Sequence, residues 1–307
     1  WLPDPSWRSV FVSGGSESVD AAIRVAQLHH VACGRSERHK VIGRDVSYHG
    51  ATLGALSAGL HDRRRKGLEQ ALLSMPKTSH YDAEELEKVI ELEGPDTISA
   101  FIGEPVIGAA AGAYVPPDDY WPRISEICAR HNILVIADEV MTGFGRLGTT
   151  MGHEALKFTP DIIAAGKGLG GGYVPIGGVY CRPDVVAPIA ETDLALMFYT
   201  FAGHDLCCAV AKKVLEIVRE ENLIDRARTM GDILRGRLEQ EFQDHPNVEE
   251  VRGRGLLQGL GLVADRDTGE PFPRSAGFAD AVSGIALENG VWVYPSGSGV
   301  FDDAVMF

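Results

Sequence analysis

The chain has 307 residues, 45% of them hydrophobic and 23% charged, which is typical of a globular protein with one large domain or two smaller ones. Its formal net charge of −14 argues against nucleic acid or an anionic membrane as the main partner. No apolar run approaches the length of a membrane span, and the first residues lack the basic and apolar regions of a signal peptide.

The cysteine and histidine content predicts no metal centre. The five cysteines are an odd number without a CxxC spacing, which favours free thiols in a reducing cytoplasm over a disulfide framework or a zinc site. His29 and His30 end an expected helix, so we predict surface residues or partners of the helix dipole. The basic run 63–66 is short and isolated, which indicates a solvated loop or a subunit contact.

The first two thirds of the chain alternate short apolar runs with amphipathic segments. The runs are continuously apolar, as strands are when helices cover both faces of their sheet. This alternation predicts an α/β domain with a mostly parallel sheet. The expected strands are 9–12, 40–44, 97–103, 133–137 and 162–165, and the expected helices are 17–32, 83–93 and 118–131.

The pattern changes after about two thirds of the chain and predicts a second, smaller α+β unit. Its expected elements are helices 205–220 and 223–242, a strand at 248–251, a glycine-rich turn at 252–255 and a strand at 256–263. We place the domain boundary within the end of the first helix, near 215–222, which gives a large domain of residues 1–218 and a small domain of residues 219–307.

Three sites could carry chemistry, and the first is Ser13-Gly14-Gly15-Ser16-Glu17, between an expected strand and an expected helix. A helix N-terminus presents free N–H groups and the positive end of the helix dipole, and glycines let a phosphate approach the backbone. Gly14, Gly15 and Ser16 are therefore candidate phosphate-binding residues. The alternative is a tight turn in which Ser16 is only the N-cap of the helix.

The second site consists of the carboxylates that follow two apolar strands. Glu104 comes directly after one expected strand and Asp138 after another, and open α/β sheets bind ligands at such carboxyl ends. A carboxylate in an apolar setting needs a partner, and a protonated ring nitrogen could be one. A salt bridge or a helix cap is the alternative for either residue.

The third site is Lys167, which lies among glycines after the strand 162–165. Partial desolvation lowers the pKa of a lysine and makes its amine nucleophilic. Gly166, Gly168 and Gly171 also spell a GxGxxG dinucleotide fingerprint. That fingerprint must open a helix, whereas the sequence of residues 173–180 predicts an extended segment.

Six motifs, in this order along the chain, resemble those of the class III, or ω-type, aminotransferases of fold type I. They are Gly14-Gly15-Ser16-Glu17, Tyr48-His49-Gly50, Glu104-Pro105, the DEVMTGFGR segment 138–146, the lysine segment 160–172 and the TFAGH segment 200–204. The resemblance implies an aminotransferase with pyridoxal 5′-phosphate as its cofactor. It also implies a large domain with a mostly parallel sheet and a smaller C-terminal α+β domain.

The resemblance also implies roles in catalysis. Lys167 would link covalently to the cofactor as a Schiff base and then move a proton, and Asp138 would pair with the pyridinium nitrogen. Tyr48 would stack on one face of the cofactor ring and Val140 would pack on the other. Glu104 would line the substrate side.

Further implied roles concern the phosphate and the subunit partner. Gly14, Gly15 and Ser16 would bind the phosphate, and His49 would be a further cofactor-binding residue. Thr200 would reach the phosphate of a neighbouring subunit, so a homodimer is expected. Two residues depart from the family pattern, because Gly14 replaces a common serine and Phe201 a frequent tyrosine. Family members also run longer than this chain at both ends.

The expected reaction transfers an amino group from an ω-amino acid or another amine to a 2-oxo acid such as pyruvate or 2-oxoglutarate. A pyridoxal-phosphate aminomutase, racemase or decarboxylase of the same fold is the alternative, and a nucleotide-binding dehydrogenase is a distant one.

The donor preference depends on the stretch 294–303. It lacks the arginine with which many family members grip an α-carboxylate, and Asp302 and Asp303 would repel one. This predicts a donor whose amine lies away from a carboxylate. The alternative is that another basic residue holds the carboxylate.

Overall fold

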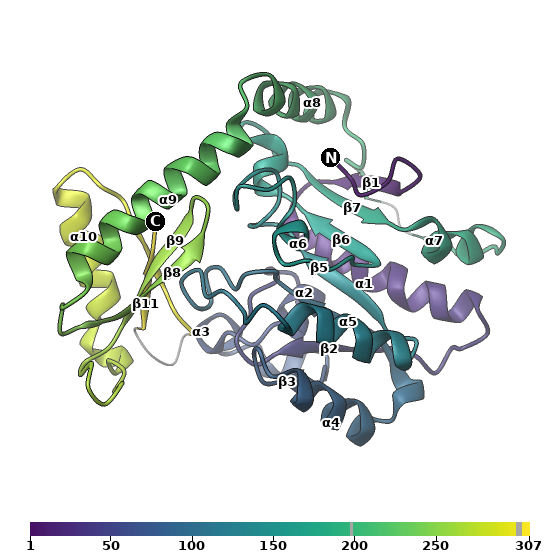
Figure 1. Ribbon diagram of the computed structural model, residues 1–307. Coiled ribbons are helices and arrows are strands. Elements are labelled where there is room, and N and C mark those ends of the chain that lie inside the picture. Colours follow the sequence, from purple (N-terminus) through teal and green to yellow (C-terminus); the bar gives the residue numbers. More distant parts are fainter. Residues whose placement is uncertain (197–198, 299–302) are drawn as a thin grey trace.

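The computed structural model describes residues 1–196, 199–298 and 303–307, which form two β-sheets with helices packed on them (Figure 1). The first sheet has seven strands in the order β1-β7-β6-β5-β4-β2-β3. The strands from β6 to β3 are parallel to their neighbours, and β7 is antiparallel to both β6 and β1. The bounds are β1 Arg8–Val12, β2 Lys40–Arg44, β3 Lys77–Thr78, β4 Ile98–Gly103, β5 Leu134–Asp138, β6 Ile162–Ala165 and β7 Gly177–Cys181. The expected α/β fold with a mostly parallel sheet is confirmed.

Helices cover both faces of this sheet, which explains why the central strands are apolar throughout. All six residues of β4 are buried, and Phe101 belongs to the core on one face while Ile102 belongs to the core on the other. The first face packs against α4 (Ala83–Glu93) and α5 (Tyr120–Arg130), and the second against α1 (Gly15–Ala32), α2 (Leu53–Ala58) and α7 (Pro183–Ala190).

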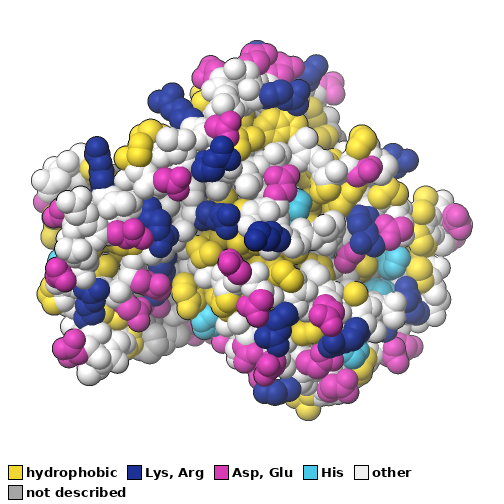
Figure 2. Space-filling model, in the orientation of Figure 1, with side chains coloured by type: hydrophobic (Ala, Val, Ile, Leu, Met, Phe, Trp, Pro, Cys, Tyr) yellow, Lys and Arg dark blue, Asp and Glu magenta, His cyan; other side chains and the backbone are white. Residues whose placement is uncertain are grey.

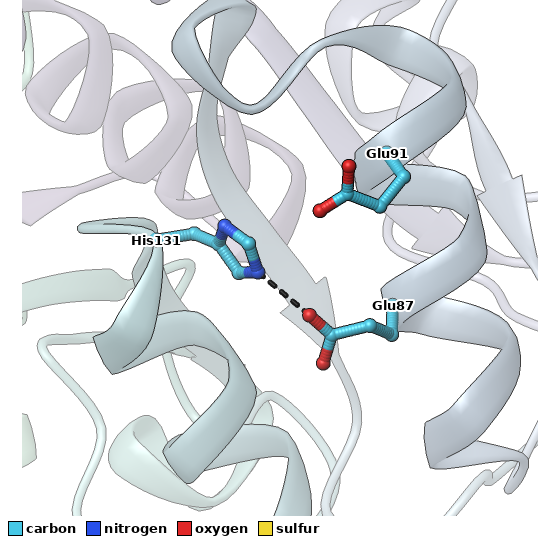
Figure 3. A group of neighbouring side chains, drawn as sticks. All are labelled: Glu87, Glu91 and His131. Atoms are coloured by element: carbon cyan, nitrogen blue, oxygen red, sulfur yellow. Dashed lines mark hydrogen bonds and ion pairs between the residues drawn. The ribbon is translucent and has the colours of Figure 1, made fainter.

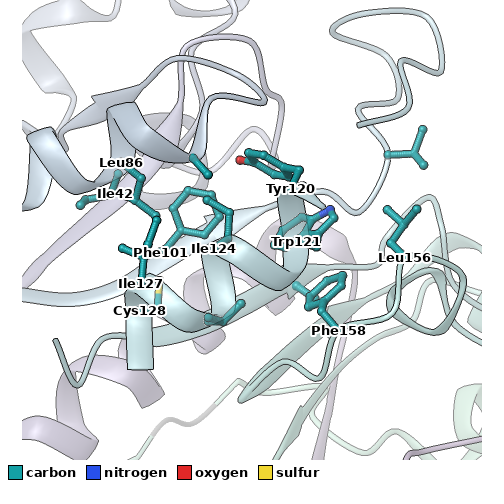
Figure 4. Packing of buried hydrophobic residues seen from close by; sticks show 14 of the residues in the cluster. Ile42, Leu86, Phe101, Tyr120, Trp121, Ile124, Ile127, Cys128, Leu156 and Phe158 are labelled. Atoms are coloured by element: carbon teal, nitrogen blue, oxygen red, sulfur yellow. The ribbon is translucent and has the colours of Figure 1, made fainter. Parts of the chain in front are cut away.

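Several aromatic side chains pack among the aliphatic ones in the core under α5 (Figure 4). The rings of Trp121 and Phe158 stack with their centroids 4.1 Å apart, and such a pair contributes about 0.5–1.5 kcal/mol beyond the burial of its area. The Trp121 indole Nε1 also donates a hydrogen bond of 3.0 Å to the carbonyl of Pro105. This bond anchors the chain just after Glu104, at the carboxyl end of β4.

Helix α1 begins at Gly15, two residues earlier than expected, with Gly14 as its N-cap. Ser16 lies inside the first turn, so the alternative in which Ser16 caps the helix is wrong. The Glu17 carboxylate instead accepts a hydrogen bond of 2.8 Å from the backbone N–H of Ser13. His30 near the other end of α1 is buried against the carbonyl of Ser99 at 3.0 Å, and not at the surface as predicted.

The second sheet has four antiparallel strands in the order β10-β11-β9-β8. Its bounds are β8 Val248–Arg254, β9 Leu257–Leu262, β10 Tyr294–Ser296 and β11 Ala304–Met306. The helices α8 (Asp205–Glu220) and α9 (Leu223–Phe242) agree with the expected ranges, and α9 packs on β8 and β9. The expected turn at 252–255 is wrong, because β8 continues to Arg254 in register with β9.

Several short elements were not expected from the sequence. They are α2, β3, α7, β10 and β11 together with α3 (Asp62–Arg65), α6 (Gly152–Ala155), α10 (Phe278–Glu288) and four 3-10 turns, η1 Glu69–Ala71, η2 Pro95–Thr97, η3 Lys167–Gly170 and η4 Arg274–Ala276. Among the described residues, no helix has the length and apolar character needed to cross a membrane.

Candidate active site

Three adjacent parallel strands bring the predicted chemical groups to one edge of the first sheet. Glu104 directly follows β4, Asp138 is the last residue of β5, and Lys167 lies two residues after β6. Because β4, β5 and β6 are neighbours and run in the same direction, their carboxyl ends meet at this edge. Open α/β sheets bind their ligands at such an edge.

Asp138 is held by a buried histidine. Its Oδ2 lies 2.7 Å from Nδ1 of His49, and its Oδ1 accepts a hydrogen bond of 3.1 Å from the backbone N–H of Val140. The Asp138 side chain is 3% exposed, and Nε2 of His49 is buried with no hydrogen-bond partner among the described residues. A carboxylate fixed in this way could bind a cationic group of a ligand.

Glu104 supports the backbone around this pair. Its two carboxylate oxygens accept hydrogen bonds from the N–H groups of Tyr48 at 3.3 Å and Gly108 at 3.2 Å. Burial raises the pKa of the Glu104 carboxyl, while the nearby His49 and Arg44 oppose that rise. The carboxyl of Glu104 is therefore tied to the loop that carries Tyr48 and His49.

Arg44 is a residue of this region that sequence reasoning missed. It is fully buried at the end of β2, and its Nη2 donates to the carbonyl of Glu104 at 2.8 Å. Its guanidinium also lies 5.4 Å from the ring centroid of Tyr81 and 5.8 Å from that of Trp121. The available signal was a charged residue directly after the apolar run 41–43 of an expected strand.

The N-terminus of α1 faces the same edge. The first N–H groups of a helix have no partner within it, and Gly14 offers no side chain to cap them. The Ser16 hydroxyl accepts a hydrogen bond of 3.0 Å from Ala51 N–H, which joins α1 to the chain after His49. Gly50 allows this approach, since it has a φ of +146° and a Cβ there would lie 2.6 Å from Ser16 Oγ.

Glycines also let Val140 pack directly on α1. A Cβ on Gly15 would lie 2.8 Å from one Val140 methyl and 3.0 Å from the other. A Cβ on Gly166 would in turn lie 3.4 Å from the Gly15 backbone. The two glycines therefore bring the start of α1 close to Val140 and to the chain just before Lys167.

Lys167 begins the short turn η3 and has a left-handed backbone with φ of +36°, which is strained for a residue with a side chain. Its side chain is exposed in a hollow of about 460 Å³. The packing around it lowers the pKa of the Lys167 amine, and the charges of Asp138 and Glu104 oppose this effect. The fingerprint alternative fails, because one 3-10 turn and the strand β7 follow where a helix would be needed.

Thr200 is placed differently from the other predicted residues. It is exposed, as is Phe201 beside it at 64%. Gly203 N–H donates to the carbonyl of Phe11 at 3.1 Å, which ties this segment to β1. The hydroxyl of Thr200 makes no hydrogen bond within the described part of the chain, so it is free to contact another molecule.

Two alternatives were expected for the basic run 63–66. The solvated loop is wrong, because Arg63, Arg64 and Arg65 belong to the short helix α3, and the subunit contact stays a prediction. Arg65 Nη1 donates to three carbonyls of the preceding segment, including that of Gly59 at 2.6 Å. Arg64 is half-buried against the ring of Tyr48. Arg64 and Arg65 therefore both have contacts within the folded chain, Arg64 with Tyr48 and Arg65 with the segment before α3.

One group of possible metal ligands occurs among the described residues (Figure 3). Glu87 and Glu91 lie on α4, and His131 directly follows α5. Glu87 is already paired with Arg130 and lies 2.7 Å from His131 Nε2. Since His131 precedes β5 and Asp138 ends that strand, the group lies at the opposite end of the sheet from Lys167.

Comparison with known proteins agrees with this architecture. The sequence profile of the family described as "Aminotransferase class-III" matches residues 2–306. The chain is 36% identical over 279 residues to the putrescine–pyruvate aminotransferase of Pseudomonas aeruginosa, which covers 85% of this chain and 61% of that protein. It is 34% identical over 322 residues to the chloroplastic gamma aminobutyrate transaminase 3 of Solanum lycopersicum, with 95% of this chain and 60% of that protein covered.

Solved structures agree as well. A thermostable (S)-enantioselective omega-transaminase from Thermomicrobium roseum superimposes with a TM-score of 0.93 at 34% identity, covering 100% of this chain and 70% of that one. The chain thus spans about 60 to 70% of the length of these relatives. The match over nearly the whole chain confirms the resemblance and the fold of type I: the chain belongs to the class III aminotransferase family.

Proposed function

We propose that this aminotransferase uses pyridoxal 5′-phosphate to transfer an amino group from an ω-amino acid or another amine to a 2-oxo acid such as pyruvate or 2-oxoglutarate. The observation that carries the proposal is the meeting of Lys167, the Asp138–His49 pair and the N-terminus of α1 at one sheet edge. When bound, pyridoxal phosphate supplies the electron sink that such a transfer needs.

The residues present fit this cofactor. The N-terminus of α1 offers N–H groups and the positive end of a helix dipole, and Gly14, Gly15 and Ser16 would hold the phosphate there. Asp138 would bind the protonated ring nitrogen, because each carboxylate oxygen has two lone pairs, and His49 Nδ1 and Val140 N–H use one on each oxygen. Glu104 accepts two backbone hydrogen bonds, one of them from Tyr48 N–H, so we propose that it positions the backbone of Tyr48 beside the cofactor.

Lys167 would supply both the covalent link to the cofactor and the proton carrier. The surrounding packing lowers the pKa of its amine, which increases the fraction in the neutral, nucleophilic form. Its Nζ would then move a proton to and from the carbon that bears the amino group. Tyr48 and Val140 are both half-buried, so each keeps a surface that could contact a planar ring.

We further propose a homodimer in which Thr200 reaches the cofactor phosphate of the partner subunit. Its exposed position supports this, and so do the large apolar side chains exposed nearby, Phe201 at 64% and Leu206 at 63%. Figure 2 shows further hydrophobic side chains gathered beneath α8, where Trp1 and Leu215 line a hollow of about 520 Å³.

The names of the relatives and the C-terminal stretch support the proposed donor class. The names of the relatives in Pseudomonas aeruginosa and Solanum lycopersicum contain putrescine and gamma aminobutyrate, amines that lie away from any carboxylate. Residues 294–303 contain no arginine or lysine. Asp302 of this stretch lies outside the described residues.

A half-reaction assay tests the proposal. The protein loaded with pyridoxal phosphate is mixed with L-alanine, β-alanine and a simple alkylamine, and the loss of its yellow colour is followed. We expect β-alanine and the alkylamine to react faster than L-alanine, and a Lys167→Ala variant to hold no covalently linked cofactor. Failure of all three amines would contradict the transfer reaction, and a much faster reaction with L-alanine would contradict the donor class.

A further inference from the structure

The three arginines of α3 have different surroundings. Arg63 is exposed, and Arg65 is occupied by the carbonyls of the segment before it. Arg64 alone turns toward the candidate active site, where its Cζ lies 4.0 Å from the ring centroid of Tyr48. This distance is well inside the range of a cation–π contact, so the guanidinium rests on the Tyr48 ring.

Arg64 is also held from the second sheet. Its Nη2 donates a hydrogen bond of 2.7 Å to the hydroxyl of Tyr294, the first residue of β10. The neighbouring Asp62 N–H donates to the carbonyl of Ser298 at 3.2 Å. The guanidinium is therefore clamped between the loop that carries Tyr48 and the strand that begins at Tyr294, and little side-chain freedom remains to be lost on binding.

Most of the donors of this clamped guanidinium are unused. Arginine has five N–H donors in a planar fork, and within the described ranges only the Tyr294 hydroxyl accepts one of them from Arg64. No carboxylate of these ranges forms an ion pair with Arg64 either. A half-buried, fixed cation with free, coplanar donors is suited to a planar anion such as a carboxylate.

The charge of Arg64 acts on the reacting lysine. Together with Arg146, Arg64 contributes to the lowered pKa of the Lys167 amine, so both cations lie within electrostatic reach of it. Arg146 is exposed and lines the hollow that Lys167 shares with α8 and α9. Arg64 instead lies over the ring of Tyr48, whose backbone N–H donates to Glu104.

On the basis of the proposed function, we propose that Arg64 binds the carboxylate of the 2-oxo acid substrate. The carboxylate of a 2-oxo acid is attached to the carbon that receives the amino group, so its anchor must lie beside the cofactor ring. The stretch 294–303 offers no arginine or lysine for this purpose. Arg64 reaches the region of residue 294 from α3, and its guanidinium is held there by its hydrogen bond to the Tyr294 hydroxyl.

The test compares acceptors with and without a carboxylate. The protein in its amino-loaded form is mixed with pyruvate or with propanal, and the return of the yellow colour is followed in wild type, Arg64→Gln and Arg63→Gln. We expect Arg64→Gln to raise the KM for pyruvate about tenfold or more, since a charge-assisted bidentate contact is lost. The KM for propanal should stay within about twofold, because propanal has no carboxylate to lose. Arg63→Gln removes the same charge from the same helix and should leave both values unchanged.

An Arg64→Lys variant checks that the effect is not loss of structure. It keeps the charge without the fork, so we expect a KM for pyruvate between those of wild type and Arg64→Gln. The proposal would be overturned if Arg64→Gln raised the KM for pyruvate and the KM for propanal equally. It would also be overturned if Arg146→Gln, and not Arg64→Gln, raised the KM for pyruvate alone. Colour loss with an alkylamine in Arg64→Gln shows that the transfer reaction itself is intact, which separates this result from a failure of the proposed function.

Discussion

The substitution Asp138→Asn tests the electrostatic centre of the site. Asparagine has the shape of aspartate, so its oxygen can still accept the 3.1 Å hydrogen bond from Val140 N–H, and its NH2 group can donate to His49 Nδ1 when the imidazole proton is on Nε2. The change therefore removes the negative charge with little change in packing. We expect the protein to fold, with its cofactor site present but without an ionised partner for the ring nitrogen.

The size of the effect follows from the burial of this carboxylate. Asp138 is 3% exposed and His49 is buried, so solvent screens the pair little. A hydrogen bond to a charged group stabilises a complex by about 1.5–3 kcal/mol relative to the same complex without that bond. At about 1.4 kcal/mol per factor of ten, loss of this contact weakens cofactor binding about 10- to 150-fold. Turnover should fall further, because without an ionised partner the ring nitrogen is less readily protonated and would accept less of the electron density that the reaction releases.

The assay has two readouts and a matched control. Cofactor affinity is measured by titrating the unloaded protein, and the amine half-reaction is measured by colour loss. Asp161→Asn makes the same chemical change, since Asp161 accepts a hydrogen bond of 2.6 Å from Val135 N–H at the opposite end of β5. It should lower thermal stability without changing the half-reaction. Near-normal affinity and turnover in Asp138→Asn would refute the reasoning and make Asp138 a purely structural residue.

Two further predictions follow from the packing. Gly15→Ala places a methyl group 2.8 Å from a Val140 methyl, so we expect cofactor affinity to fall about tenfold. The second change in Gly15→Ala/Val140→Ala removes this close contact, so the affinity should recover. A lack of recovery in the cofactor titration would contradict the close-packing argument. Phe201→Glu puts a charge into an exposed apolar side chain next to Thr200, so sedimentation should show dimers for wild type and monomers with weakened cofactor binding for the variant. An active wild-type monomer would contradict the shared site.

Local sequence signals predicted the parts of the fold in which neighbouring residues decide the conformation. The central strands are apolar on both faces and the long helices α8 and α9 are amphipathic, so each of these elements was visible in a short window. The short elements were not visible in this way. The strands β10 and β11 have three residues each, and they exist because β9 and each other supply their hydrogen-bond partners.

The candidate site likewise has parts that the sequence predicted and parts that it did not. The positions of Lys167, Asp138 and Glu104 after apolar strands were legible in the sequence, because parallel strands place their carboxyl ends at one edge. The partners of these groups were not legible. His49 is 89 residues from Asp138 along the chain, and Arg44 is 60 residues from Glu104.

The sequence by itself therefore determined the family, the α/β fold and the candidate residues for the chemistry, because these depend on local hydrophobic pattern and on motifs in a given order. Only the tertiary structure decided which side chains surround them. The clearest case is Arg64, which in the sequence is one of four consecutive basic residues. Its contacts with Tyr48 and Tyr294 arise because the chain folds two separate segments, 230 residues apart in the case of Tyr294, onto the same guanidinium.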